Sequence, residues 1–138
     1  MKIYVVRHGE TLFNQKKRVQ GWCDSPLTDK GIHQAMALGR GLADIEFVGA
    51  YSSTSERAID TAQYIIGTRD ISLTPLKGLK EMNFGTLEGE YEEEVLAKDG
   101  SSHDKGFVEF GGETIAMTQE RMIKTLADLS QKMEMYLW

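Results

Sequence analysis

The chain has 138 residues, 41% of them hydrophobic and 27% charged, which indicates one globular domain over residues 1–138 and excludes fibrous, disordered and two-domain chains. Its net charge of −5 argues against a nucleic-acid partner, and no apolar run approaches the roughly 20 residues of a membrane span. The single cysteine, Cys23, excludes an internal disulfide and favours the cytoplasm.

Strands and helices alternate in the first half of the chain. Residues 3–6 are β-branched or aromatic and end in charge and Gly9, a pattern that predicts a buried strand. Thr28 is the expected N-cap of a helix with apolar residues at helical spacing as far as Leu42. The elements expected next are a strand over 47–52, a helix from Ser55 to Ile66 and a strand over 71–76.

The second half contains a long connection and one long helix. Residues 77–112 are rich in Gly and Glu, with a short helix expected near 91–98. Apolar side chains on one face predict a final helix from about Thr114. This order predicts an α/β fold, a three-layer sandwich with a mostly parallel sheet and helices on both faces. Ligands of such folds bind beyond the carboxyl ends of strands, where His8 falls.

His8 and the arginine before it are the first candidates for chemistry. A neutral imidazole is nucleophilic near pH 7 because its pKa lies close to that value. The guanidinium of Arg7 presents a fork of donors that fits phosphate or carboxylate oxygens. Taken alone, the dipeptide favours a solvated polar strand end, so its interpretation depends on the surrounding motifs.

Several ordered motifs supply that context. They are Arg-His-Gly-Glu-Thr at 7–11 followed by Asn14, Gln-Gly-Trp at 20–22, Asp-Ser-Pro-Leu-Thr at 24–28, Tyr-Ser-Ser at 51–53 with Arg57, Leu-Lys-Glu at 79–81 with Phe84-Gly85 and Glu88-Gly89, and Gly-Gly-Glu-Thr at 111–114. In this order and spacing they resemble the histidine phosphatase superfamily, also called phosphoglycerate mutase-like. The resemblance spans nearly the whole chain and implies a phosphoglycerate mutase-like fold.

The resemblance also implies residue roles. His8 attacks phosphorus and becomes phosphohistidine, while Arg7 and Arg57 hold the phosphoryl oxygens and spread the charge of the transition state. Glu81 is the general acid for the leaving oxygen, then the base for the incoming water or alcohol. The family requires no metal or other cofactor, and the sequence shows no ligand cluster with metal-like spacing. The implied substrate-binding residues are Asn14, Gln20 and Gly21.

Simpler interpretations exist for three of these residues. Arg57 could be an ordinary surface arginine of a helix, and Glu81 a solvated carboxylate among many acidic residues. Asn14 suits a turn or a helix cap equally well.

The family pattern contains a second active-site histidine, after the last long helix and one more hydrophobic strand. This chain stops at Trp138, so we expect it to lack the last strand or strands and helix of the fold. The other histidines, His33 and His103, precede the long helix, and His103 is a weak substitute. Losing a key electrostatic donor typically costs roughly 100- to 1000-fold in rate. If Leu137 uses a TTR codon, residues 135–138 back-translate to codons that, read one base upstream, encode a hydrophobic run like the family's next strand, so we hypothesise a frameshift.

The sequence therefore predicts a phosphomonoester phosphatase that acts through a phosphohistidine on His8, impaired because the second histidine is absent. The residues around Gln20 and Glu81 favour the phosphatase branch over the first alternative, a cofactor-dependent phosphoglycerate mutase. The second alternative is a non-catalytic remnant that binds phosphate. The expected partner is a small phosphorylated metabolite, without nucleic acid or membrane, and an exposed sheet edge would favour a homodimer.

Overall fold

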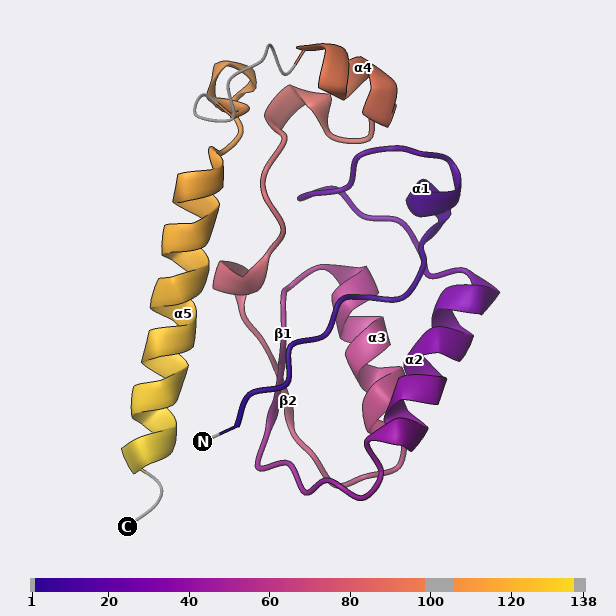
Figure 1. Cartoon of the computed structure of the whole chain (residues 1–138), viewed down its shortest axis with the longest axis vertical. Helices are drawn as coiled ribbons and strands as arrows, with labels where there is room; N and C mark the ends of the chain where they lie inside the picture. Colours follow the sequence, from indigo (N-terminus) through magenta and orange to yellow (C-terminus); the bar gives the residue numbers. More distant parts are fainter. Residues whose placement is uncertain (1, 99–105, 136–138) are drawn as a thin grey trace.

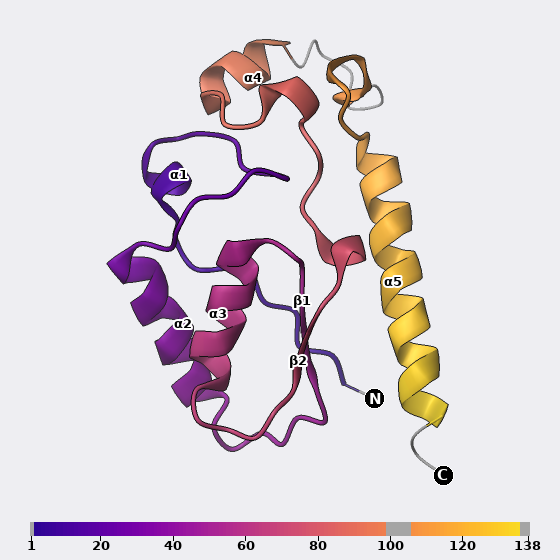
Figure 2. The same ribbon diagram turned by 180° about the vertical axis from the view of Figure 1, so that it is seen from behind.

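Helices flank a short parallel sheet on both sides. The computed structural model describes residues 2–98 and 106–135. Its elements, in chain order, are α1 (Leu12–Gln15), α2 (Asp29–Gly41), β1 (Ala50–Ser52), α3 (Glu56–Ile66), β2 (Leu73–Pro75), η1 (Lys77–Leu79), η2 (Gly85–Leu87), α4 (Glu92–Lys98), η3 (Val108–Phe110) and α5 (Ile115–Met135). Helices α2 and α3 lie on one side of the strands and α5 on the other in both views (Figure 1, Figure 2).

The sheet is parallel, as the alternation of elements predicts. Strands β1 and β2 pair in register, Ala50 opposite Leu73, with α3 as the connection between them. Helix α3 packs against both strands and against α2, whereas α5 contacts the 3-10 turn η1. The α/β class and the placement of helices on both sides are thus confirmed, although each strand is shorter than its expected range.

The predicted helix after Thr28 is confirmed as α2. The Thr28 side chain accepts a hydrogen bond from the Gly31 backbone N–H at 3.1 Å, which satisfies one of the free donors of the first turn. The helix buries Gly31 and Ala35 and packs against α3. Helix α5 likewise begins where predicted, directly after Thr114.

The predicted strand over 3–6 is wrong. These residues form an extended segment that runs past β1 and β2 without joining the sheet (Figure 1). Its side chains are exposed, and Val5 retains 87% of its accessible surface. A strand requires a neighbouring backbone with which to exchange hydrogen bonds, and within the described residues this segment has none. Side-chain pattern reports β preference but not whether a partner strand is present.

The connection over 77–112 is organised by a small apolar core. Leu87, Val95 and Phe107 are buried together, and the rings of Phe84 and Phe107 meet edge to face at 4.8 Å. The expected short helix is α4, which contributes Val95. His103 and Trp138 lie outside the described residues. Among the helices of residues 2–98 and 106–135, none is long and apolar enough to cross a membrane.

Candidate active site

His8 lies at the end of the extended N-terminal segment, where the chain meets α2 and α3. The Gly9 backbone N–H donates to Thr61 Oγ1 at 3.1 Å, and the Glu10 N–H donates to Gln34 Oε1 at 2.9 Å. Gly9 also packs against Gly31 so closely that an added Cβ would lie 2.8 Å from the Gly31 carbonyl carbon. These contacts anchor the loop at the His8 end.

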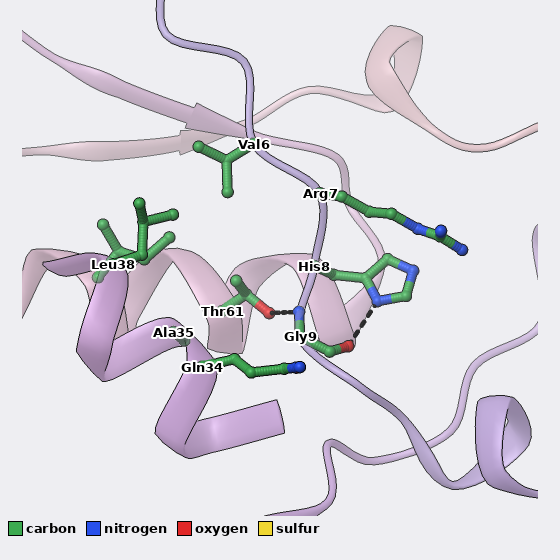
Figure 3. A pocket seen from close by; sticks show the side chains of 9 residues that line it. Val6, Arg7, His8, Gly9, Gln34, Ala35, Leu38 and Thr61 are labelled. Atoms are coloured by element: carbon green, nitrogen blue, oxygen red, sulfur yellow. Dashed lines mark hydrogen bonds between the residues drawn. The ribbon is translucent and has the colours of Figure 1, made fainter. Parts of the chain in front are cut away.

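The hydrogen bond of His8 fixes its tautomer. Nδ1 lies 2.8 Å from the carbonyl oxygen of Gly9, which only accepts, so Nδ1 carries a proton (Figure 3). In the neutral imidazole the lone pair is therefore on Nε2, which makes no hydrogen bond within the part of the chain described here. An Nε2 lone pair held in this way is available as a nucleophile.

The surroundings of His8 favour the neutral imidazole. Burial lowers the pKa of His8 below its ordinary value of 6.5, while the hydrogen bond to Gly9 opposes this effect. The positive charges of Arg57 and Arg7 lower the pKa further, and the negative charge of Glu81 raises it. The same three charges identify the side chains that the fold gathers around the imidazole.

The two arginines differ in how they are held. Arg7 is exposed, and its side chain extends to the same side of the loop as the His8 ring, away from Ala35 and Leu38 (Figure 3). Arg57, in the first turn of α3, is only 2% exposed. Arg7 therefore lies on the solvent side of the site, whereas Arg57 is buried in the protein beside it.

The guanidinium of Arg57 binds the loop over residues 20–24. Nη1 donates to the Cys23 carbonyl at 2.9 Å and to Asp24 Oδ1 at 3.0 Å. Nη2 donates to the carbonyls of Gln20 and Gly21 at 3.1 and 3.0 Å. The buried Nε–H has no partner among the described residues. Arg57 is thus not a surface arginine, and its Nε–H remains as a donor.

Glu88 holds the same loop from the opposite side. Its carboxylate accepts backbone N–H bonds from Gly21 at 3.0 Å, Trp22 at 2.6 Å and Cys23 at 3.1 Å, and a fourth from Phe84 at 3.0 Å. Burial raises the pKa of Glu88, but the hydrogen bonds outweigh it, so that the pKa lies below its usual range. Glu88 therefore joins this loop to the segment that follows Glu81.

Glu81 lies on an exposed bend between η1 and η2. Its Oε1 accepts a hydrogen bond from the Met82 backbone N–H at 2.8 Å, which ties the carboxylate to its own backbone. The Trp22 indole N–H donates to the Glu81 carbonyl at 3.1 Å. The side chain is exposed and contributes negative charge at His8, a placement open to solvent and substrate.

Of the proposed substrate-binding residues, Gln20 and Gly21 lie on the loop over 20–24 and Asn14 lies in α1. Asn14 forms a capping box with Thr11, in which its Oδ1 accepts from the Thr11 N–H at 3.0 Å. The Gln20 side chain is buried, and its Oε1 accepts from the Thr11 hydroxyl at 3.3 Å and the Ser25 hydroxyl. Gly21 is buried against the Met82 carbonyl and the Phe84 ring. Asn14 thus serves as a cap, and its phosphate contact remains a prediction.

Sequence reasoning gave no role to several residues that organise this site. Asp24 and Glu88 fall inside quoted motifs, whereas Thr61 lies outside them, and the partners of all three are distant in the chain. Among the described residues, no group of three or more His, Cys, Asp or Glu side chains could hold a metal ion.

A cavity of about 330 Å³ adjoins the loop at His8. Its apolar lining is Val6, Ala35, Leu38 and Ile65, and Arg7 and His8 also border it. The Arg7 side chain and the His8 ring extend away from Ala35 and Leu38 (Figure 3). An imidazole that feels the charges of two guanidinium groups and a carboxylate is an arrangement suited to phosphoryl transfer.

Comparison with known proteins agrees with this class of site. Residues 3–136 match the histidine phosphatase superfamily, branch 1, and the chain belongs to that family. It is 37% identical to the fructose-2,6-bisphosphatase TIGAR B of Danio rerio, over 94% of this chain and 53% of the relative. It is 36% identical to a 2,3-bisphosphoglycerate-dependent phosphoglycerate mutase of Buchnera aphidicola subsp. Schizaphis graminum, over 72% of this chain and 45% of the relative.

The fold is also that of solved members. YhfR of Bacillus stearothermophilus superimposes with a TM-score of 0.84 at 34% identity, over 91% of this chain and 65% of YhfR. The chain thus spans about half the length of the relatives it matches and about two thirds of this structure.

Proposed function

We propose that this chain carries the nucleophilic side of a phosphomonoester phosphatase, with His8 as the residue that receives the phosphoryl group. The observation that carries the proposal is the His8 imidazole itself. Its Nδ1–H is bound to the Gly9 carbonyl, its pKa is lowered by burial, and its Nε2 is unbonded among the described residues. This is the state in which imidazole attacks phosphorus.

The reaction then has two steps. The anionic phosphate of the bound substrate favours the protonated form of Glu81. His8 Nε2 then attacks phosphorus, the N–P bond forms, and the ester P–O bond breaks as Glu81 gives this proton to the leaving oxygen. Water then attacks the phosphorus of the phosphohistidine, Glu81 takes a proton from this water, and the N–P bond breaks to release phosphate. Arg7 and Arg57 place positive charge beside the transferring group in both steps, where oriented donors stabilise the transition state.

The motifs around Gln20 and Glu81 support the phosphatase branch, and the TIGAR B likeness is consistent with it. The substrate class is a small phosphorylated metabolite of the cytoplasm, with Asn14, Gln20 and Gly21 on the substrate side. A phosphoglycerate mutase is the second candidate, favoured by the similarity to the Buchnera mutase. Hydrolysis of an aryl phosphate, compared with isomerisation of 3-phosphoglycerate in the presence of a bisphosphoglycerate primer, separates the two.

Trapping the intermediate tests the proposal. The chain is incubated with a radiolabelled phosphomonoester, quenched in alkali and digested, and the label is located. We expect acid-labile phosphate on the peptide that contains His8, and none in His8→Asn. His33→Asn is the matched control, since His33 is exposed on α2, and it should retain the label. If phosphate binds but no label appears on His8, the chain is a phosphate-binding protein and the phosphatase proposal is wrong.

A further inference from the structure

The bend that carries Glu81 is held by a residue outside the site. Residues 80–84 connect η1 to η2 and belong to no strand or helix, so their backbone groups need donors and acceptors from elsewhere. Because the Glu81 carboxylate is bonded to the Met82 N–H, its position follows the position of this backbone. Whatever fixes the bend therefore fixes the carboxylate.

Arg121 of α5 supplies most of the donors. Its Nη1 donates to the carbonyls of Gly78 and Lys80 at 2.9 and 2.8 Å, and its Nη2 reaches the carbonyl of Glu81 at 3.3 Å. Three carbonyls on one guanidinium define the course of the chain immediately before the carboxylate. Helix α5, on the other side of the strands from α2 and α3, contacts η1 at this place (Figure 1).

Glu113 fixes Arg121 and the other end of the bend. Its two oxygens accept from Arg121 Nε at 2.9 Å and Nη2 at 2.8 Å, a bidentate pair with side chains 13% and 20% exposed. The same carboxylate accepts the Asn83 N–H at 2.9 Å. Burial raises the pKa of Glu113, but its hydrogen bonds from Arg121 and Asn83 outweigh this effect, so that the pKa lies below its usual range. The backbone is therefore held on both sides of Glu81, by Arg121 before it and by Glu113 after it.

The packing of α5 restricts movement of the bend relative to the helix. Gly78 lies directly against the Thr125 side chain, and any side chain at position 78 would overlap it. Thr125 is itself bonded through its hydroxyl to the Arg121 carbonyl at 2.8 Å. The bend thus cannot shift along the helix without breaking either this contact or the guanidinium bonds.

We propose that Arg121, oriented by Glu113, is a positioning residue that sets the Glu81 carboxylate at His8. This inference rests on the proposed function, in which Glu81 is the general acid. A merely structural tie would stabilise the chain without affecting what Glu81 does at the imidazole. The two roles are therefore separated by a measurement made at His8 rather than by stability alone.

The first measurement is the NMR titration of the His8 ring. Because the charge of Glu81 raises the pKa of His8, Glu81→Gln should lower it. Arg121→Lys keeps the positive charge but cannot bind three carbonyls and a carboxylate, so it should lower the His8 pKa in the same direction. Lys124→Ala breaks an exposed ion pair with Asp128 on the same helix and is the matched control, with no change expected.

The second measurement is the dependence of hydrolysis on the leaving group. General acid catalysis contributes roughly 100- to 10,000-fold, and mostly where the leaving oxygen is basic. Arg121→Lys should lower kcat on an alkyl phosphate by about 10-fold or more, and on 4-nitrophenyl phosphate by much less, as Glu81→Gln does on a larger scale.

The outcomes distinguish this inference from the proposed function. If Arg121→Lys folds and its His8 titration matches that of Lys124→Ala, while Glu81→Gln shifts it, the positioning role is wrong and the function stands. If neither the unaltered chain nor any variant forms phosphohistidine, the proposed function is wrong. The His8 titration then still shows whether Arg121 positions Glu81. Should Arg121→Lys fail to fold, Glu113→Gln retains Arg121 and is expected to give the same shift in smaller measure.

Discussion

Replacement of Arg57 by alanine should destabilise the chain more than replacement of any exposed arginine. The change removes four hydrogen bonds to the loop over 20–24 from a side chain that is 2% exposed. Breaking a buried ion pair typically costs about 3–5 kcal/mol, and each buried carbonyl left without a donor about 1–3 kcal/mol. Asp24 is 25% exposed and water can reach the loop, so we expect the lower figure, about 3 kcal/mol.

Urea unfolding followed by tryptophan fluorescence measures this loss, because Trp22 lies in the loop that Arg57 holds. Arg40→Ala is the control, since Arg40 is exposed in the last turn of α2, and it should change the free energy of unfolding by no more than about 0.5 kcal/mol. Arg7→Ala should resemble this control in stability yet weaken vanadate binding. If the free energies of unfolding of Arg57→Ala and Arg40→Ala differ by less than about 0.5 kcal/mol at equal m-value, the loop does not depend on Arg57.

Further predictions concern protons and close packing. The His8 ring should titrate below pH 6.5, and added inorganic phosphate should raise its pKa, because an adjacent anion favours imidazolium; a phosphate-independent midpoint would contradict the site. The lowered pKa of Glu88 means that its stabilisation is present above about pH 4.5 and lost as the pH falls through the folded-state pKa. The difference in unfolding free energy between the unaltered chain and Glu88→Gln should therefore shrink in acid, and a difference constant from pH 7 to 3 would count against it. Gly31→Ala should destabilise, because the new Cβ would lie 2.8 Å from the Glu10 backbone nitrogen, whereas Gly41→Ala meets nothing within 4 Å and should leave thermal stability unchanged or slightly raised.

The helices were predictable because their signals are local. Thr28 caps α2 through a hydrogen bond three residues away, and the apolar face of α5 repeats within the helix itself. The segment over 3–6 carries an equally clear strand pattern, yet it pairs with no described strand. Pairing depends on a distant backbone, which a run of four residues does not encode.

The site shows the same division. His8, Arg7, Arg57 and Glu81 could be proposed from ordered motifs, and the charges of the last three act on the pKa of His8. The burial of Arg57 and its four loop acceptors could not be foreseen, because those acceptors are mostly backbone carbonyls and carry no residue signature. Asn14 illustrates the opposite case, since its side chain serves the local cap that its position equally suggested.

Different interactions hold the part of the site around Glu81, its acid half, and the part around His8, its nucleophile half. These interactions determine which half is more rigid. The acid half is fixed by charged groups, with Glu88 on four backbone N–H groups and Arg121 on three carbonyls. The nucleophile half is fixed by neutral hydrogen bonds at Gly9 and Glu10 and by close packing on α2, while the segment before it makes no backbone hydrogen bonds to the sheet among the described residues. Charge-assisted bonds are roughly twice as strong as neutral ones, so the His8 side should loosen first. Hydrogen exchange should accordingly be faster at the Gly9 amide than at the amides of Trp22 and Asn83, because these donate to carboxylates.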